Sequence, residues 1–344
     1  MSILLGLLAF GLHGLNEQAK GSNCLLGLAV NVTATGGAKE LIDSIVEEKK
    51  LGCKLMASSV KWGDLEASPS VIKIDKLRND LANASNFGFT PVLTLQTIDT
   101  NNRTLPPDLM AEPFDSPKML GRLEALMDAV ANVLPKGPGP VMLGNEVDAY
   151  LLGHPSEVRA YETFLHSARK RLKEKRPGTS VGVTTMFGTM AANLSLVREL
   201  QDGMDLVAMT YYPLGANFQV LLVSDVGKHF GTMVQFCGNR KLYVQEAGYP
   251  AAPLLNSSEE KQAKFVDALF DTMKRQESRL YGVSYFLSID FSDKLVDTFV
   301  KYYGLSADTF RAYLATLGLK DQFGTPRLAW PEFKKRAIEF TGGS

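Results

Sequence analysis

Eight short apolar runs recur along the chain, each bounded by turn residues and separated from the next by a helical pattern. The runs are too short for helices, and strands that alternate with helices are typical of βα units, which build parallel sheets. The expected strands are residues 25–32, 54–60, 91–98, 141–146, 180–186, 206–211, 242–246 and 281–289. No break in composition divides them. The sequence therefore predicts one α/β domain over residues 24–344, a single (β/α)8 TIM barrel.

Composition argues against several kinds of partner. The chain contains 37 Lys and Arg and 37 Asp and Glu, so it lacks the basic excess that binds nucleic acid. Its cysteines (Cys24, Cys53 and Cys237) have neither metal-ligand spacing nor a disulfide framework. Cys53 and Cys237 lie beside expected strands, so we expect both to be small buried apolar residues. We also expect no metal, no organic cofactor and a monomeric protein.

The N-terminal segment has some features of a signal peptide. Residues 3–15 are apolar enough for its hydrophobic region but too short to span a bilayer, so no membrane span is expected. No Lys or Arg precedes them and no clear small-x-small cleavage site follows. We expect secretion or an extracytoplasmic location, with residues 1–23 as the leader, and leave their cleavage open.

Two of the expected strands end in a glutamate. The apolar run 141–143 leads into Gly144, Asn145 and Glu146, and the run 242–244 leads into Gln245 and Glu246. In a parallel barrel the C-terminal ends of the strands form the rim where active sites are built. Two carboxylates brought to one rim by separate strands are the groups that glycoside hydrolysis requires.

The position of these residues resembles the retaining glycoside hydrolases of clan A. In that clan an Asn-Glu pair after strand four supplies the acid/base, and a Glu after strand seven is the nucleophile. Residues 59–66, 317–319 and 324–327 also look like segments of the clan. The stretches 211–213 and 246–250 are loosely similar to the endo-galactanases. Many clan members end strand eight with a Trp under the sugar, whereas this strand reads Tyr285-Phe286-Leu287-Ser288. Either Phe286 takes that place or the sugar platform lies elsewhere.

The resemblance implies a role for each candidate residue. Glu146 would be the acid/base and Glu246 the nucleophile of a double displacement on a poly- or oligosaccharide. Asn145 would bind the sugar 2-hydroxyl, and Tyr211 or Tyr212 would donate a hydrogen bond that keeps Glu246 charged and oriented. The remaining expected contacts to the sugar are Trp62, as a stacking platform or a packed rim residue, and Asn31, Phe286 and Asp290.

Other functions have weaker support in the sequence. A metal-dependent barrel hydrolase would show His-x-His near strand one, and a serine hydrolase would show Gly-x-Ser-x-Gly; the chain has neither. A Schiff-base aldolase would need a strand-end lysine, for which Lys61 is the one candidate. The main alternative is a barrel that binds carbohydrate without cleaving it.

Overall fold

The computed structural model describes residues 24–137 and 139–343, and its strands form one sheet. Their order is β6-β5-β3-β2-β1-β10-β9-β8-β7, with the short β4 paired to β3. The two ends of this order, β6 and β7, are consecutive pieces of the same stretch, separated only by Val183. The fifth expected strand is thus split, and it pairs with β5 through one piece and with β8 through the other. The expected (β/α)8 barrel is confirmed.

The strands agree closely with the expected runs. Their bounds are β1 (Leu25–Leu28), β2 (Leu55–Lys61), β3 (Thr90–Asp99), β4 (Asn102–Arg103), β5 (Val141–Asn145), β6 (Val181–Gly182), β7 (Thr184–Met186), β8 (Val207–Tyr211), β9 (Leu242–Ala247) and β10 (Leu280–Tyr285). The first and last are shorter than expected, because the chain leaves the ladder before Val32 and before Ile289.

Two compact units make up the chain, and the first covers residues 56–210. Its helices are α2 (Trp62–Leu65), α3 (Asp75–Asn86), α4 (Pro117–Val133), α5 (Val147–Gly153), α6 (Val158–Lys175), α7 (Phe187–Ala192) and α8 (Leu194–Leu200), with short 3-10 helices η1 (Pro107–Leu109) and η2 (Pro155–Glu157). Ser116 caps α4 by accepting a hydrogen bond from the Met119 N–H, and Pro117 occupies the first turn, where its missing N–H costs no hydrogen bond. Leu123, Met127 and Val130 of this helix are fully buried.

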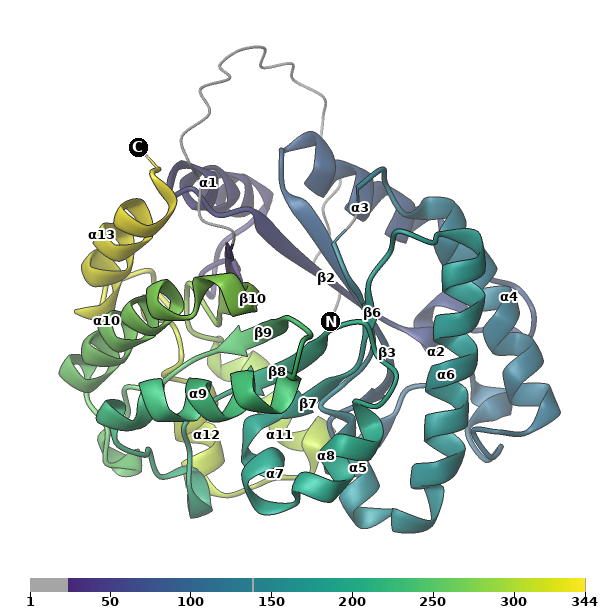
Figure 1. Ribbon diagram of the computed structural model, residues 1–344. Coiled ribbons are helices and arrows are strands. Elements are labelled where there is room, and N and C mark those ends of the chain that lie inside the picture. The colour runs from purple at the N-terminus through teal and green to yellow at the C-terminus, as the bar shows by residue number, and fades with distance from the viewer. Residues whose placement is uncertain (1–23, 138, 344) are drawn as a thin grey trace. The chain divides into compact units, whose positions relative to one another are not determined.

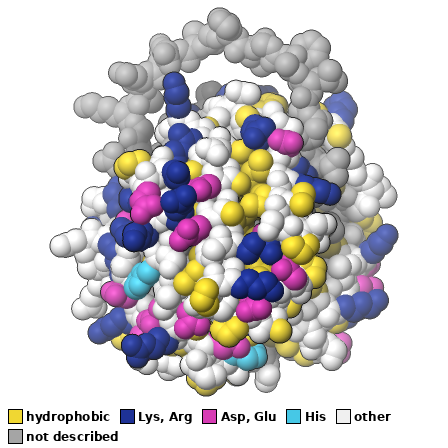
Figure 2. Space-filling model, turned by 90° about the vertical axis from the view of Figure 1, so that its right-hand side faces the viewer, with side chains coloured by type: hydrophobic (Ala, Val, Ile, Leu, Met, Phe, Trp, Pro, Cys, Tyr) yellow, Lys and Arg dark blue, Asp and Glu magenta, His cyan; other side chains and the backbone are white. Residues whose placement is uncertain are grey.

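Helices α4 and α6 lie side by side on the outside of this unit (Figure 1). The face that they carry shows basic and acidic side chains interspersed (Figure 2). Arg171 of α6, for example, donates from Nε and Nη2 to the two carboxylate oxygens of Asp128 on α4. This face therefore has no large field of one sign.

The second unit contains residues 24–55 and 211–343 of the described chain. Its helices are α1 (Ala38–Lys50), α9 (Val226–Cys237), α10 (Glu259–Arg275), α11 (Asp293–Tyr303), α12 (Asp308–Leu314) and α13 (Ala329–Thr341), with 3-10 helices η3 (Ala216–Phe218), η4 (Val223–Asp225), η5 (Pro253–Leu255) and η6 (Glu277–Arg279). Helix α10 packs against both α9 and α13 (Figure 1). Parallel pairing of β1 with β10 joins the two stretches of this unit.

Some details differ from expectation. The Ser-x-x-Glu pattern of residues 257–260 predicts a capping box that begins at Ser257. This is wrong, because Ser258 caps α10 by accepting a hydrogen bond from the Lys261 N–H, and the Ser257 hydroxyl donates to the Pro250 carbonyl. Cys53 and Cys237 are buried free thiols, as expected.

The leader assigned to residues 1–23 lies outside the described residues. Among the residues described, none of the helices has the length and apolar character needed to cross a bilayer.

Candidate active site

The backbone takes an unusual path where β5 ends. Gly144 has a φ of 93°, and a Cβ there would collide with Val147 and the Tyr161 hydroxyl, so only glycine fits. Glu146 follows with φ 47° and ψ 42°, in the left-handed region that a side chain of this size seldom occupies. Such strain persists only where the surroundings enforce it, and it is concentrated at functional sites. The end of β5 is therefore built to hold Glu146 in one place.

Two threonines hold the Glu146 carboxyl. Thr210 of β8 donates to Oε1 at 2.7 Å, and Thr100, just after β3, donates to Oε2 at 2.9 Å. Burial raises the pKa of Glu146 above its ordinary value, and the two threonine hydrogen bonds act in the opposite direction. The charge of Asp99 raises the pKa further. Glu146, although half-exposed, is thus in surroundings that favour its protonated form.

Asn145 and Asp99 stand opposite each other on paired strands. Their backbones are in register between β5 and β3, and the Asn145 amide donates to Asp99 Oδ1 at 3.3 Å. Both side chains are largely buried. The contact orients the Asn145 amide, the group that was expected to meet a sugar hydroxyl.

Asp148 is a buried carboxyl that the sequence reasoning missed. It accepts from the Met186 N–H at 3.1 and 3.2 Å and from Thr189. Burial raises its pKa to about 7, and the nearby charge of Glu146 contributes in the same direction. Asp148 lies two residues after Glu146, which could have suggested that it belongs to the same site. The neighbouring sequence does not show, however, that its side chain is buried.

Glu246, the residue before the last of β9, belongs to a second cluster. It is the one residue of β9 that is not buried, and its Oε2 accepts a 2.7 Å hydrogen bond from the Tyr212 hydroxyl. Gly248 allows the close approach of Tyr212, because a Cβ there would meet the Tyr212 ring and the Phe286 carbonyl. The Tyr212 ring in turn contacts Phe286, with centroids 6.4 Å apart. The Glu146 cluster belongs to the first unit and the Glu246 cluster to the second.

Of the two tyrosines expected to serve Glu246, the structure selects Tyr212. Tyr211 is fully buried and its hydroxyl hydrogen-bonds to His229. Its ring packs edge-on against Phe230. We therefore assign the hydrogen bond to Glu246 to Tyr212.

Two other expected sugar contacts, Trp62 and Asn31, are buried in the fold. Trp62 is fully buried and its Nε1 donates to Glu66 at 2.7 Å, so it is the packed rim residue and not a platform. Asn31 is buried and bonded to Ser288 and to the backbone of Ile289, which fastens the exit of β1 to the segment after β10.

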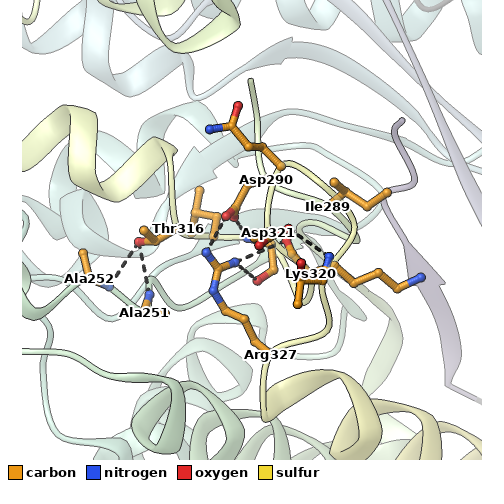
Figure 3. A network of polar contacts seen from close by, with 12 residues as sticks. Ala251, Ala252, Ile289, Asp290, Thr316, Lys320, Asp321 and Arg327 are labelled. Carbon is orange, nitrogen blue, oxygen red and sulfur yellow. Dashed lines mark hydrogen bonds and ion pairs between the residues drawn. The ribbon is translucent and has the colours of Figure 1, made fainter. Parts of the chain in front are cut away.

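Asp290 is the centre of a polar network that includes the loop before α13 (Figure 3). It is 2% exposed, and its carboxylate accepts from the Arg327 guanidinium and from the Gly318 N–H. Burial raises its pKa to about 6, and Arg327 acts against this. In the same network the Thr316 hydroxyl accepts from the Ala251 and Ala252 N–H groups, which follow Glu246 in the chain. Asp290 therefore stabilises the fold beyond β10 and is not available to a sugar.

The described residues were also searched for side chains that could bind a metal ion. Within residues 24–137 and 139–343, no three His, Cys, Asp or Glu side chains are grouped so that they could hold an ion.

Comparison with known proteins gives a consistent result at the level of structure. No model of a known protein family matches the sequence, and no curated protein matches it. Among solved structures, GH5_18 from Streptomyces cattleya, solved with GlcNAc, aligns over 93% of this chain and 81% of its own, with a TM-score of 0.69 and 15% identity. An exo-β-1,4-mannosidase from Opitutaceae bacterium strain TAV5 aligns over 93% of this chain but 60% of its own, with a TM-score of 0.71 and 17% identity.

A β-glucosidase is also similar, with a TM-score of 0.63, 15% identity and 88% of each chain covered. Because the sequence identities are this low, the similarity to these structures shows a shared fold only. The chain has the (β/α)8 barrel fold of these glycoside hydrolases.

Proposed function

We propose that the protein is a retaining glycoside hydrolase that cleaves O-glycosidic bonds of an oligo- or polysaccharide, with Glu146 as acid/base and Glu246 as nucleophile. The observation that supports the assignment is that the ends of two buried strands bring two carboxyls into different surroundings. Burial raises the pKa of Glu146 even though Thr210 and Thr100 donate hydrogen bonds to it, whereas Glu246 is partly exposed and accepts a hydrogen bond from Tyr212. Carboxyl pairs whose surroundings differ in this way divide the acid and nucleophile roles between them.

In the first step Glu246 attacks the anomeric carbon while Glu146 gives its proton to the departing glycosidic oxygen. A glycosyl ester of Glu246 forms and the leaving alcohol departs neutral. In the second step Glu146, now a carboxylate, takes a proton from water as the water oxygen attacks the same carbon and releases Glu246. Asn145, oriented by Asp99, would bind the 2-hydroxyl, and Tyr212 would keep the attacking oxygen in place.

The fold supports this proposal. The strands β5 and β9 both belong to the parallel barrel, whose strand C-termini form the usual site of catalysis. The structural neighbours act on mannosides and glucosides, so β-linked hexosides are the first substrates to test. An oligo- or polysaccharide substrate also favours the extracytoplasmic location expected from the N-terminal sequence.

Dinitrophenyl β-mannoside and β-glucoside, together with the matching disaccharides, test the assignment. Glu246→Gln should abolish turnover of all of them, because no glycosyl ester can form. Glu146→Gln should lose about 10²–10⁴-fold on a disaccharide. It should lose far less in the first step on a dinitrophenyl glycoside, whose leaving group needs little protonation.

Glu174→Gln, a change at a half-exposed carboxylate of α6, should leave turnover unaltered. If the wild type binds these sugars but cleaves none of them, the protein is a carbohydrate-binding barrel and the proposal is wrong.

A further inference from the structure

The proposed reaction gives no role to Asp148, although this residue lies two positions after Glu146. Its side chain is fully buried in the first turn of α5, the helix that begins directly after Glu146. The Ala149 N–H donates to the Glu146 carbonyl at 3.0 Å, so the two acidic residues share one tight turn. A buried carboxyl is costly unless it is hydrogen-bonded or protonated. Its presence in this turn therefore calls for a physical reason.

Both oxygens of Asp148 bind a segment that lies far along the chain. The Met186 N–H, at the end of β7, donates to Oδ1 at 3.2 Å and to Oδ2 at 3.1 Å. Thr189 of α7, the helix that begins directly after β7, hydrogen-bonds the same carboxyl. Asp148 therefore ties the turn that carries Glu146 to the junction between β7 and α7.

This contact closes a ring of interactions that returns to Glu146. Met186 of β7 is in register with Thr210 of β8. The Thr210 hydroxyl in turn donates to Glu146 Oε1 at 2.7 Å. All the residues of this ring belong to the first unit. Because the ring passes through strand pairing and hydrogen bonds, a change at Asp148 alters the position of Glu146 relative to its donor Thr210.

The two carboxyls also affect each other electrostatically. Burial raises the pKa of Asp148 to about 7, and the charge of Glu146 raises it further, while the hydrogen bonds from Thr189 and Met186 act against both. An interaction between two titrating groups is mutual. The charge of Asp148 must therefore favour the protonated form of Glu146.

The other charges around α5 leave this link in place. Helix α5 packs on β3, β7, α8 and η2. The charged residues on these elements are Asp99 (β3), Glu157 (η2), and Arg198 and Glu199 (α8). Asp99 acts on Glu146, Glu157 accepts from the Tyr150 hydroxyl, and the two on α8 are exposed. The charge that acts on Asp148 is that of Glu146.

We propose that Asp148 is a positioning residue for Glu146, which holds the turn of this acid against β7 and β8 and links the protonation of the two carboxyls. The inference rests on the proposed function, because Glu146 acts there as the acid/base. Loss of Asp148 should therefore impair proton transfer to the leaving group and spare the attack by Glu246.

Two variants separate the roles of Asp148. Asp148→Ala removes the acceptor for the Met186 N–H, whereas Asp148→Asn keeps an oxygen there and cannot ionise. Asp205→Ala is the matched control, since Asp205 accepts from the Val181 N–H at 3.0 Å and so anchors β6, the other piece of the split fifth strand. The substrates are a β-linked disaccharide, whose leaving group needs a proton, and the dinitrophenyl glycoside of the same sugar.

Below pH 7, where Asp148 is mostly protonated, the two substrates should respond differently. Asp148→Ala should lower kcat/KM on the disaccharide about 10- to 100-fold and leave the dinitrophenyl glycoside unaffected, because that leaving group needs no acid. Asp148→Asn should retain most of the activity on both. Asp205→Ala should change both by the same factor, whatever it costs in thermal stability. An equal loss on both substrates for Asp148→Ala, or an Asp148→Asn variant that is as impaired, would overturn the inference.

A titration of the carboxyls tests the link without any turnover. In protein labelled with ¹³C at the glutamate δ carbon, the Glu146 signal is the one that Glu146→Gln removes. In the wild type, its chemical shift should show its own titration and a second, smaller inflection near pH 7 that comes from Asp148. Asp148→Asn should abolish the second inflection, and Asp205→Asn should keep it. A wild type without this inflection, or an Asp148→Asn variant that retains it, would overturn the inference.

These measurements distinguish failure of the inference from failure of the proposed function. If no glycoside is cleaved, the proposed function fails, and the titration alone judges Asp148. The titration also decides if Asp148→Ala does not fold. If glycosides are cleaved and Asp148→Ala spares the disaccharide, the proposed function stands and the inference fails.

Discussion

At the scale of single residues, opposing influences decide whether Glu146 holds its proton. Burial and the charge of Asp99 favour the neutral acid, and the donors Thr210 and Thr100 favour the carboxylate. An acid that also acts as a base needs a proton affinity near the working pH, because it must give and take the same proton in one cycle. The threonines prevent burial from making Glu146 too weak an acid.

Removal of one donor should shift this balance in a known direction. The carboxylate of Glu146 loses a hydrogen bond in Thr210→Val, so its pKa should rise further. The alkaline limb of the profile of kcat/KM against pH reports the acid in the free enzyme, and it should therefore move to higher pH. Thr163→Val, at an exposed hydroxyl on α6, should leave the profile in place. A limb that moves to lower pH would contradict the account.

The residues around the two glutamates show where sequence reasoning stops. Glu146 and Glu246 follow apolar runs, so local pattern is enough to place them at strand ends. Tyr211 and Tyr212 are neighbours, and consecutive side chains of an extended segment point to opposite sides. Their roles depend on register, which a single sequence does not show. Sequence could not decide between a sugar contact and a structural role for Trp62, Asn31 and Asp290, because their burial depends on partners 4 to 258 residues away.

At the scale of elements, α1 carries a buried carboxyl against β1. Glu48 is 1% exposed, and its Oε1 accepts a hydrogen bond from the Leu28 N–H at 3.0 Å. No group in the described part of the chain hydrogen-bonds to its Oε2. Burial raises the pKa of Glu48 well above its usual range, and the bond from Leu28 acts against this. An acid whose pKa is higher in the folded chain favours folding below its unfolded pKa. That stabilisation is lost as the pH rises toward the folded pKa.

Glu48→Gln should therefore stabilise the protein at pH 8 and not at pH 4. The amide keeps the acceptor for Leu28 and carries no charge, so we expect a gain of about 1 kcal/mol in the free energy of unfolding at pH 8. Urea titrations at both pH values measure it. Glu47→Gln, at the neighbouring and partly exposed position, should show no such gain at pH 8. A stabilisation of Glu48→Gln that grows toward low pH would contradict the assignment.

The segment between α12 and α13 is fastened by Arg327. Its guanidinium binds the buried Asp290 and the carbonyls of Gly318 and Lys320 (Figure 3). Arg327→Met leaves the Asp290 charge buried without its partner, which should cost about 3–5 kcal/mol of unfolding free energy. Adding Asp290→Asn should recover part of the loss. If the single variant is as stable as the wild type in denaturant, the network does not carry the stability assigned to it.

At the scale of the whole molecule, the order of the strands underlies the proposed function. The parallel sheet runs through all of the βα units, and the two ends of its strand order, β6 and β7, are the two pieces of the split fifth strand. Periodicity could predict this architecture, because each βα unit has its own local pattern. Helices α11 and α12 were not predicted, because they follow the last strand and the repeating strand–helix pattern does not require additional helices there. The threonines that hold Glu146 were missed because threonine at a strand end is commonplace.

The stereochemistry of hydrolysis tests the central claim most directly. A nucleophilic Glu246 and an acid/base Glu146 require two displacements at the anomeric carbon, and their carboxyls should lie about 5–5.5 Å apart. Proton NMR of the first sugar formed from an aryl β-glycoside, recorded before mutarotation, shows which anomer is released. The account predicts the β anomer. Release of the α anomer would mean a single displacement by water, with Glu246 as a base, and would contradict the account.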